Sequence, residues 1–192
     1  KEIIRFSSDV GVKALSLYAF STENWARPKT EIDALCSLFV EFFNREFDEL
    51  NENNVCIRAL GDTSKFPTEV DRLIRNANQK TKDNTGLKLN IAMNYGSRDE
   101  ILRAARLAAE EPGGVTRENF EKHLYTAGLP DVDLLIRTGG EERVSNFLLY
   151  QISYAEFVFP KTFWPDFTQE RYIETLKTFS ERSRRFGGLE KP

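Results

Sequence analysis

The sequence predicts an α/β fold: a single domain with a central, mainly parallel sheet flanked by helices. Short apolar runs alternate along the chain with longer segments whose apolar residues recur every three or four positions. The short runs are apolar at almost every position, which is typical of strands covered on both faces in a parallel sheet. With 192 residues, 40% of them hydrophobic, the chain is long enough to form such a core, and we expect residues 1–192 to form one domain.

Five segments are predicted to be strands. They are rich in aliphatic and aromatic residues, and most are bounded by Gly, Asn, Asp or Pro. In chain order they span residues 12–20, 55–62, 87–95, 133–140 and 156–160. In a parallel sheet, the loops that follow such strands build the ligand site.

Helices are predicted between and around these strands, at 2–10, 31–50, 67–82, 98–110, 116–125, 144–154 and 168–185. The helix 31–50 has the longest pattern. Its apolar residues fall on one face, namely Ile32, Leu35, Phe39, Phe42, Phe43, Phe47 and Leu50. Gly11 is expected to end the first helix. Ser97 and Glu100 are expected to form a capping box at the start of the helix 98–110.

The composition excludes several classes of function. Lys and Arg number 27 against 30 Asp and Glu, so the net charge of −3 gives no overall attraction to nucleic acid or to an anionic membrane. No apolar run approaches the roughly 18 residues of a membrane span. Cys36 and Cys56 are expected to be reduced core residues, and His123 a half-exposed helix residue. Catalytic triads and zinc sites are therefore poorly supported.

The stretch "YAFSTENWARP" (18–28) follows the first predicted strand and is the first candidate site. A plain connection would use Gly, Asn, Asp and Pro for their backbone angles. This loop instead carries hydroxyls, an acid, an amide, an indole and a guanidinium. Such a mixture suits a ligand with both polar and apolar parts.

The stretch "IRTGGEERVSNF" (136–147) is the second candidate. Arg137, Arg143 and Ser145 follow a predicted strand at the expected start of a helix, beside two glycines that let a ligand approach the backbone. Two guanidiniums, a hydroxyl and helix-end N–H groups suit a phosphate or diphosphate. The alternative is a glycine turn whose arginines pair with Glu141 and Glu142. Composition alone does not decide between these two.

Glu156 opens the last predicted strand, where an acid needs a partner. A nearby arginine would serve, and so would Mg²⁺ held by one or two acids and phosphate oxygens. The phenylalanine face of the helix 31–50 is either core or the wall of an apolar cavity. The cluster "RSRRFGG" (182–188) would usually be a solvated basic tail.

Five stretches together resemble the cis-prenyltransferase family, in order along nearly the whole chain. They are "YAFSTENWARP" (18–28), "NYGSRDEI" (94–101), "DLLIRTGGEERVSNFLLYQISYAE" (133–156), "FWPDF" (163–167) and "RRFGG" (184–188). The resemblance implies a transferase that condenses isopentenyl diphosphate with an allylic diphosphate such as farnesyl diphosphate, each step making a Z double bond. The expected product is a long polyprenyl diphosphate for a cell-wall lipid carrier, with undecaprenyl as the default length.

The resemblance further implies an apolar tunnel for the growing chain, a requirement for Mg²⁺, and a homodimer. It implies a cytoplasmic protein with at most peripheral contact at the inner face of the plasma membrane. No nucleic-acid partner is expected, because the net charge is negative. Leu87, Leu89 and Ile91 are expected to line the tunnel together with the phenylalanine-rich helix.

Position by position, the resemblance assigns roles to individual residues. Arg137, Arg143 and Ser145, with the backbone of Val144, are expected to hold the diphosphate of isopentenyl diphosphate. Glu156 matches the metal ligand, and Asn24 matches the asparagine assigned to catalysis. Substrate contacts are expected from Ser21, Thr22, Glu23, Trp25 and Arg27.

Two further positions match weaker parts of the family pattern. Glu31 matches an acid in a mobile stretch. The triplet Arg185-Phe186-Gly187 matches a C-terminal motif that reaches the diphosphate of the partner subunit.

One part of the family pattern has no match here. Family members begin with a strand and a phosphate loop resembling "MDGNGRW", whose aspartate serves in metal binding and catalysis, and a histidine follows. We expect that this segment precedes Lys1 in the natural protein. The abrupt Pro-Gly-Gly join near Glu111 and Pro112 raises the separate question of whether a stretch is missing there, which the sequence alone leaves open. The alternative is a non-catalytic, prenyl-diphosphate-binding partner subunit. Without the resemblance, the chain would be a generic α/β enzyme acting on a nucleotide or sugar phosphate.

Overall fold

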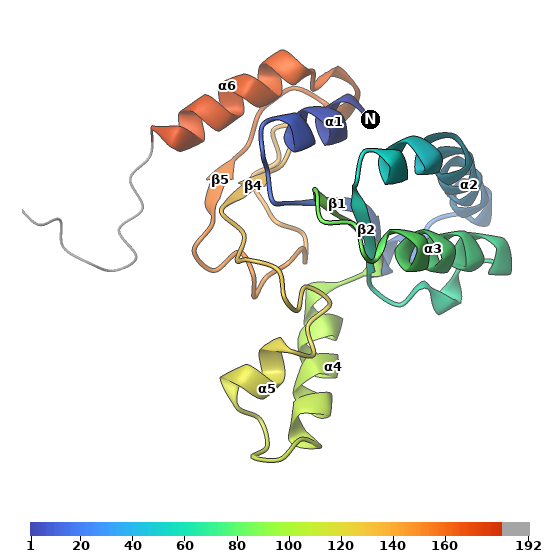
Figure 1. Cartoon of the computed structure of the whole chain (residues 1–192), viewed down its shortest axis with the longest axis vertical. Coiled ribbons are helices and arrows are strands. Elements are labelled where there is room, and N and C mark those ends of the chain that lie inside the picture. The colour runs from blue at the N-terminus through green and yellow to red at the C-terminus, as the bar shows by residue number, and fades with distance from the viewer. Residues whose placement is uncertain (182–192) are drawn as a thin grey trace, which may run out of the picture. The chain divides into compact units, whose positions relative to one another are not determined.

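The computed structural model describes residues 1–181, and contacts within the chain divide it into two units. The first unit consists of Lys1 and Ile3–Leu129, and the second of Glu2 and the described residues from Pro130 onward. Figure 1 shows the elements of both units in chain order. The assignment of residues 1–192 to a single domain stays a prediction.

The first unit is built on a three-stranded parallel sheet. Strands β1 (Ala14–Ser21), β2 (Cys56–Leu60) and β3 (Lys88–Tyr95) are arranged in the order β1-β3-β2. The central strand β3 is buried at every position after Lys88, whereas β1, at the edge, is only half-buried at most positions. The parallel pairing of these three strands confirms the predicted parallel sheet. The predicted burial of strands on both faces is confirmed for β3 but not for β1.

Helices α2 (Lys29–Glu52) and α3 (Thr68–Thr81) pack against each other beside this sheet, and Figure 1 shows them side by side. Leu89, Ile91 and Met93 alternate along β3, so they share one face, and they belong to the same apolar core as Phe43 of α2. The predicted apolar face of the helix 31–50 is confirmed, since all its members are in or against this core. The predicted tunnel-lining residues Leu87, Leu89 and Ile91 are core residues here.

Side chains of α3 satisfy the outer edge of β2. The N–H of Ile57 donates to Thr81 Oγ1 over 2.9 Å, and the N–H of Ala59 donates to Asn78 Oδ1 over 3.1 Å. The Thr81 hydroxyl in turn donates to the Ala77 carbonyl over 2.8 Å. Since alternate residues of an edge strand point their backbone groups outward, these bonds occupy donors that would otherwise lack a partner.

The remaining helices of the first unit are α1 (Glu2–Asp9), α4 (Ser97–Ala109) and α5 (Arg117–Glu121). Helix α1 ends as predicted, with Gly11 in the left-handed region at φ +79°. Helix α5 begins as predicted, because Thr116 Oγ1 accepts from the N–H of Asn119. It ends at Glu121, so His123 lies just beyond the helix, where its Nε2 is 2.9 Å from Glu111 Oε1.

The capping box predicted at Ser97 and Glu100 is wrong. Gly96 is the N-cap of α4, and Ser97 is already helical. The Glu100 carboxylate instead accepts hydrogen bonds from the Tyr95 hydroxyl and from the N–H of Tyr125, the latter over 2.7 Å. Tyr95 and Glu100 are almost wholly buried, so these bonds compensate the acid for its loss of water.

The second unit contains a two-stranded parallel sheet, β4 (Leu134–Ile136) and β5 (Glu156–Val158), followed by α6 (Gln169–Ser180). The five predicted strands therefore exist and pair in parallel, but within the described residues they form two sheets rather than one. Short 3₁₀ turns occur at Thr22–Ala26, Thr63–Lys65 and Trp164–Asp166. The predicted cluster 182–188 and the end of the helix 168–185 lie outside the described residues.

The helix predicted over 144–154 is wrong. Ser145, Asn146 and Leu148 have φ values of +47°, +62° and +48°, which are left-handed and cannot continue a right-handed helix. The segment forms a succession of turns. Its apolar residues, such as Leu148 and Ile152, are still buried, which explains why their spacing imitated a helix.

Two smaller predictions can also be compared with the structure. Cys36 in α2 and Cys56 in β2 are both buried and free, as predicted. Within residues 1–181, no helix is both long and apolar enough to cross a membrane.

We expect Gly61→Ala to destabilise the fold strongly. Gly61 follows β2 at φ +115°, and a Cβ there would lie 2.3 Å from the Met93 carbonyl oxygen and 2.8 Å from that of Asn94. Both contacts are with backbone, which cannot move aside, so the free energy of unfolding should fall by about 2–4 kcal/mol in urea denaturation. The control is Gly11→Ala, where φ is +79° but no atom lies within 4 Å. It should lose only about 1–2 kcal/mol, and equal losses would contradict the steric argument.

Candidate functional site

The first predicted segment forms a tight turn directly after β1. Ser21 ends the strand, residues 22–26 make a 3₁₀ turn, and Pro28 is the N-cap of α2. The N–H of Ser21 donates to Asn24 Oδ1 over 2.8 Å, so the carbonyl end of this side chain closes the turn. The Nδ2 group is therefore the end of Asn24 that can donate to a substrate.

Trp25 is anchored through its ring and through its nitrogen. Its ring centroid lies 5.0 Å from that of Phe20 and 5.2 Å from that of Phe66. Its Nε1–H donates to Asn94 Oδ1 over 2.7 Å, and Asn94 Nδ2 donates to the Asp62 carbonyl over 2.6 Å. These contacts join the turn after β1 to the ends of β2 and β3. Asn94 had no role in the sequence analysis, although it lies in the quoted stretch "NYGSRDEI".

The other polar residues of this turn are exposed or half-exposed. The Thr22 hydroxyl donates to Glu23 Oε2 over 3.3 Å. Arg27 Nη1 lies 2.6 Å from Glu31 Oε1, one helical turn further on. Ion pairs of this exposed kind contribute about 0.3–0.5 kcal/mol, so a diphosphate could readily replace Glu31 as the partner of Arg27.

Tyr18 is a further residue of this region that the sequence analysis did not assign. Its hydroxyl donates to the Tyr95 carbonyl over 3.0 Å. Burial raises the pKa of Tyr18 to about 12, and the nearby negative charge of Glu23 adds to the effect, while a hydrogen bond with Ser21 opposes it. Tyr18 is therefore a neutral hydroxyl beside the first segment at any physiological pH.

The second predicted segment brings together its three key residues. Arg137 Nη1 donates to the Arg143 carbonyl and to Ser145 Oγ, each over 2.6 Å. The guanidinium of Arg143 pairs with Glu141, as the alternative interpretation expected for one of the two arginines. Val144 lies between Arg143 and Ser145 in the sequence, and its carbonyl accepts a hydrogen bond from the N–H of Phe147. The cluster therefore exists, with Arg143 held by a neighbouring acid.

The two glycines of this segment, Gly139 and Gly140, also make backbone hydrogen bonds that stabilise the fold. The N–H of Gly139 donates to the Thr162 carbonyl and that of Gly140 to the Pro160 carbonyl, over 2.8 and 3.0 Å. Both residues have positive φ, which other residues rarely adopt. Since no helix begins here, the expected helix-end N–H groups are absent. The side chains of Arg137, Arg143 and Ser145 are the candidate donors to an anion, and the role expected of the Val144 backbone stays a prediction.

Glu156 lies at a different level of the two-stranded sheet from Arg137. It begins β5 opposite Leu134, whereas Arg137 follows Ile136, which pairs with Val158. Three strand residues separate the two levels, or about 10 Å along the strand. Within residues 1–181, no three His, Cys, Asp or Glu side chains gather as a metal site. A single carboxylate suits Mg²⁺ only when substrate oxygens and water complete the coordination.

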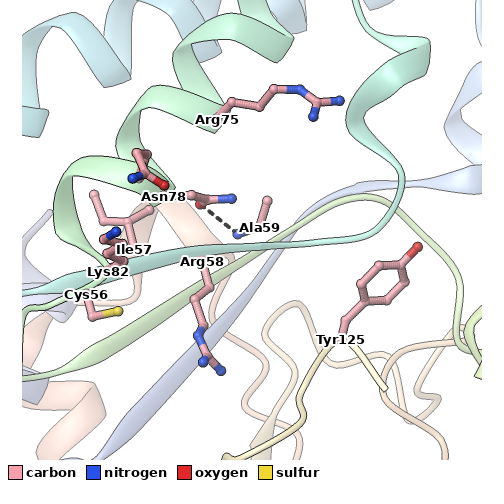
Figure 2. Close-up of a pocket in the computed structure, with 9 residues that line it drawn as sticks. Cys56, Ile57, Arg58, Ala59, Arg75, Asn78, Lys82 and Tyr125 are labelled. Atoms are coloured by element: carbon pink, nitrogen blue, oxygen red, sulfur yellow. Dashed lines mark hydrogen bonds between the residues drawn. The ribbon is translucent and has the colours of Figure 1, made fainter. Parts of the chain in front are cut away.

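A cavity of about 610 Å³ lies along the outer side of β2 and α3, and Figure 2 shows its lining. It contains none of the predicted site residues. Arg75 and Arg58 extend to opposite sides of β2 (Figure 2). Arg75 pairs with Asp71 over 2.8 Å, and Arg58 Nη1 donates to the Ala127 carbonyl over 3.2 Å. Both cations therefore already have partners in the fold.

Comparisons with known proteins agree with the resemblance. A family model described as "Putative undecaprenyl diphosphate synthase" matches residues 1–187. An isoprenyl transferase from Clostridium tetani is 46% identical, covering 98% of this chain and 77% of that protein. The ditrans,polycis-undecaprenyl-diphosphate synthase, (2E,6E)-farnesyl-diphosphate specific, from Micrococcus luteus is 47% identical, covering 98% and 79%.

Two solved structures are similar over almost the whole chain. One is a probable undecaprenyl diphosphate synthase from Campylobacter jejuni, with a TM-score of 0.89 and 40% identity over 97% of this chain and 88% of that chain. The other is lavandulyl diphosphate synthase from Lavandula x intermedia in complex with dimethylallyl diphosphate. Its TM-score is 0.91, with 34% identity over 97% of this chain and 84% of that chain.

We expect the free energy of unfolding to depend on Tyr18 at alkaline pH. The pKa is about 12 in the folded protein and about 10 in an unfolded chain, so the unfolded state loses the proton first. The stabilisation is complete below about pH 10 and is lost as the pH rises towards 12. Urea denaturation at about pH 9 and about pH 11 should show a smaller loss for Tyr18→Phe than for the wild type. Equal losses would contradict the raised pKa.

Proposed function

The chain belongs to the cis-prenyltransferase family, and the matching family model is described as an undecaprenyl diphosphate synthase. From this membership we propose which of the two predicted segments binds which substrate. The protein is a prenyltransferase that extends an allylic diphosphate with isopentenyl units. We infer farnesyl diphosphate as the starting substrate and undecaprenyl diphosphate as the product. The relatives are named as enzymes, and no observation favours a non-catalytic subunit.

The cluster of Arg137, Arg143 and Ser145 is the observation that carries the proposal. It offers two guanidiniums and a hydroxyl within one short segment, which is the donor set that a diphosphate needs. The diphosphate of isopentenyl diphosphate would replace Glu141 as the partner of Arg143, because a diphosphate carries more charge and more acceptor oxygens. Arg137 would keep Ser145 in position through its hydrogen bond to the Ser145 hydroxyl.

The turn after β1 would bind the allylic substrate. Trp25 offers an apolar ring surface to the prenyl chain, and Arg27 offers a cation to the diphosphate. Asn24 Nδ2 would donate to the reacting substrates, since its Oδ1 is occupied by Ser21. Ser21, Thr22 and Glu23 would complete the polar side of this turn.

The chemistry asks the protein mainly for position and charge. The allylic carbon–oxygen bond breaks and diphosphate leaves with the electron pair. The double bond of isopentenyl diphosphate then forms the new carbon–carbon bond, and a proton is lost from the adjacent carbon. Arginines beside the leaving diphosphate stabilise the charge that develops there. Holding both substrates together removes much of the entropic barrier.

Mg²⁺ would add positive charge at a diphosphate, with Glu156 as the protein ligand and phosphate oxygens as the others. We propose that the protein acts as a homodimer in the cytoplasm, with at most peripheral contact at the inner face of the plasma membrane. The phenylalanine face of α2 would give way to the growing chain by side-chain movement, since it is only partly buried at Phe39, Phe42 and Phe47.

The test is an assay of the full-length protein with farnesyl and isopentenyl diphosphates and Mg²⁺, in which we expect long-chain products with new Z double bonds. In the same assay, Arg143→Ala should raise the KM for isopentenyl diphosphate about 10- to 100-fold, because a hydrogen bond to a charged group is lost. The matched control is Arg171→Ala, an exposed arginine paired with Glu174 in α6. It should behave as the wild type.

Glu141→Gln sharpens this test. It frees Arg143 from its partner without removing the guanidinium. The KM for isopentenyl diphosphate should therefore stay the same or fall. An effect of Arg143→Ala confined to farnesyl diphosphate would contradict the assignment, and a wild type that forms no product would contradict the proposed activity.

Glu156→Gln should raise the Mg²⁺ concentration needed for half-maximal rate by about tenfold or more, since a charged ligand becomes neutral at similar size. The readout is a metal titration at saturating substrates. Glu174→Gln, which neutralises an exposed acid of α6, is the control and should not shift the titration. An unchanged titration for Glu156→Gln would show that this acid has a structural role.

A further inference from the structure

Asn94 lies near the end of β3 and connects this strand to the segments that follow β1 and β2. Its Oδ1 accepts from Trp25 Nε1 over 2.7 Å, and its Nδ2 donates to the Asp62 carbonyl over 2.6 Å. Its partners are 69 and 32 positions away in the sequence. We propose that Asn94 is the positioning residue of the allylic-substrate turn, acting through Trp25. This inference rests on the proposed function of that turn.

The burial of the Asn94 side chain indicates that it positions a neighbouring residue and does not contact the substrate directly. Asn94 is only 4% exposed. A side chain so covered, with both ends of its amide engaged, does not face a ligand. Trp25 is half-buried and belongs to the turn itself. Asn94 can therefore influence a substrate only through the residue that it holds.

The hydrogen bond supplies what ring packing alone does not. Phe20 and Phe66 pack against the indole at centroid distances of 5.0 and 5.2 Å. Apolar burial itself is non-directional, and the preferred geometry of an aromatic pair adds only about 0.5–1.5 kcal/mol, so packing alone fixes the ring orientation weakly. The bond from Nε1 to Asn94 fixes the one polar atom of the indole and thereby the orientation of the ring. Asn24 is the neighbouring residue in the same short turn, so its position depends on that of Trp25.

The backbone around Asn94 is shaped for this contact. Asn94 has φ +50°, a left-handed conformation that asparagine tolerates better than most residues. The turn that carries Asp62 begins at Gly61, where a Cβ would lie 2.8 Å from the Asn94 carbonyl oxygen. The absence of a side chain at Gly61 therefore allows this turn to approach the end of β3 closely enough for Asn94 to reach the Asp62 carbonyl.

The experiment compares Asn94→Gly with Asn54→Gly in the full-length enzyme. Asn54 also has positive φ, at +58°, and its side chain also makes two hydrogen bonds, to the hydroxyl and the N–H of Thr85. Both variants therefore lose two bonds at a backbone position where glycine is unstrained. Asn54 lies in the turn between α2 and β2, and it is not a member of the substrate segments.

We expect Asn94→Gly to lower kcat/KM for farnesyl diphosphate by about 10- to 100-fold, since misplacing a substrate-contacting group by about 1 Å has effects of this size. The KM for isopentenyl diphosphate should change much less, and Asn54→Gly should match the wild type. A merely structural role would reduce the amount of active enzyme without raising either KM. Trp25→Phe removes the indole N–H, and in that background Asn94→Gly should have little further effect.

A second readout needs no substrate. In the full-length enzyme, the NMR signal of the Trp25 indole N–H is identified as the one that disappears in Trp25→Phe. Its hydrogen exchange should be slow with Asn94 and fast in Asn94→Gly. Equal exchange, or an unchanged kcat/KM for farnesyl diphosphate, would overturn the inference. A wild type without any product would overturn the proposed function instead, while slow exchange lost in Asn94→Gly would still establish the anchoring of Trp25.

Discussion

The burial of β3 is the constraint on which the first unit depends. From Leu89 to Tyr95, every residue of this strand is buried, so its backbone N–H and C=O groups must be satisfied by strands on both sides. Both neighbours are parallel, and parallel neighbours need long crossovers rather than tight hairpins. Helices α2 and α3 lie in those crossovers and bury their apolar faces in the same core. The parallel pairing also brings the carboxyl ends of β1, β2 and β3 to one edge. The turn after β1, Asp62 and Asn94 meet there for that reason.

Local pattern was enough to predict most of the fold. The spacing of apolar residues in 31–50 and the apolar runs of the strands are properties of neighbouring positions, and they correspond to α2 and to β1–β5. The segment 144–154 shows the limit of this reasoning. Its buried residues are spaced as in a helix, but the backbone at Ser145 and Leu148 is left-handed. The side chain of Arg137 holds Arg143 and Ser145 there, and such a contact between separate parts of the chain has no signature in local spacing.

The candidate site, like the fold, could be predicted from the sequence only in part. The sequence identified Arg137, Arg143 and Ser145 by residue type and position, and the structure brings them together. The sequence could not reveal which of these residues already have a partner in the fold, because the pairing of Arg143 with Glu141 depends on side-chain conformation. It also could not identify Asn94 as the partner of Trp25, since 69 positions separate them. The level of Glu156 relative to Arg137 depends on strand register, which only the pairing of β4 with β5 defines.

The side chains that cover the edge of β2 have a consequence for the protein in concentrated solution. An edge strand with vacant donors is a template on which a strand from another molecule can assemble. Thr81 and Asn78 already accept from the outward N–H groups of Ile57 and Ala59. An incoming strand would have to displace both side chains before it could pair. The fold thus carries its own protection against aggregation along this edge, and this protection lasts as long as the last turns of α3 stay wound.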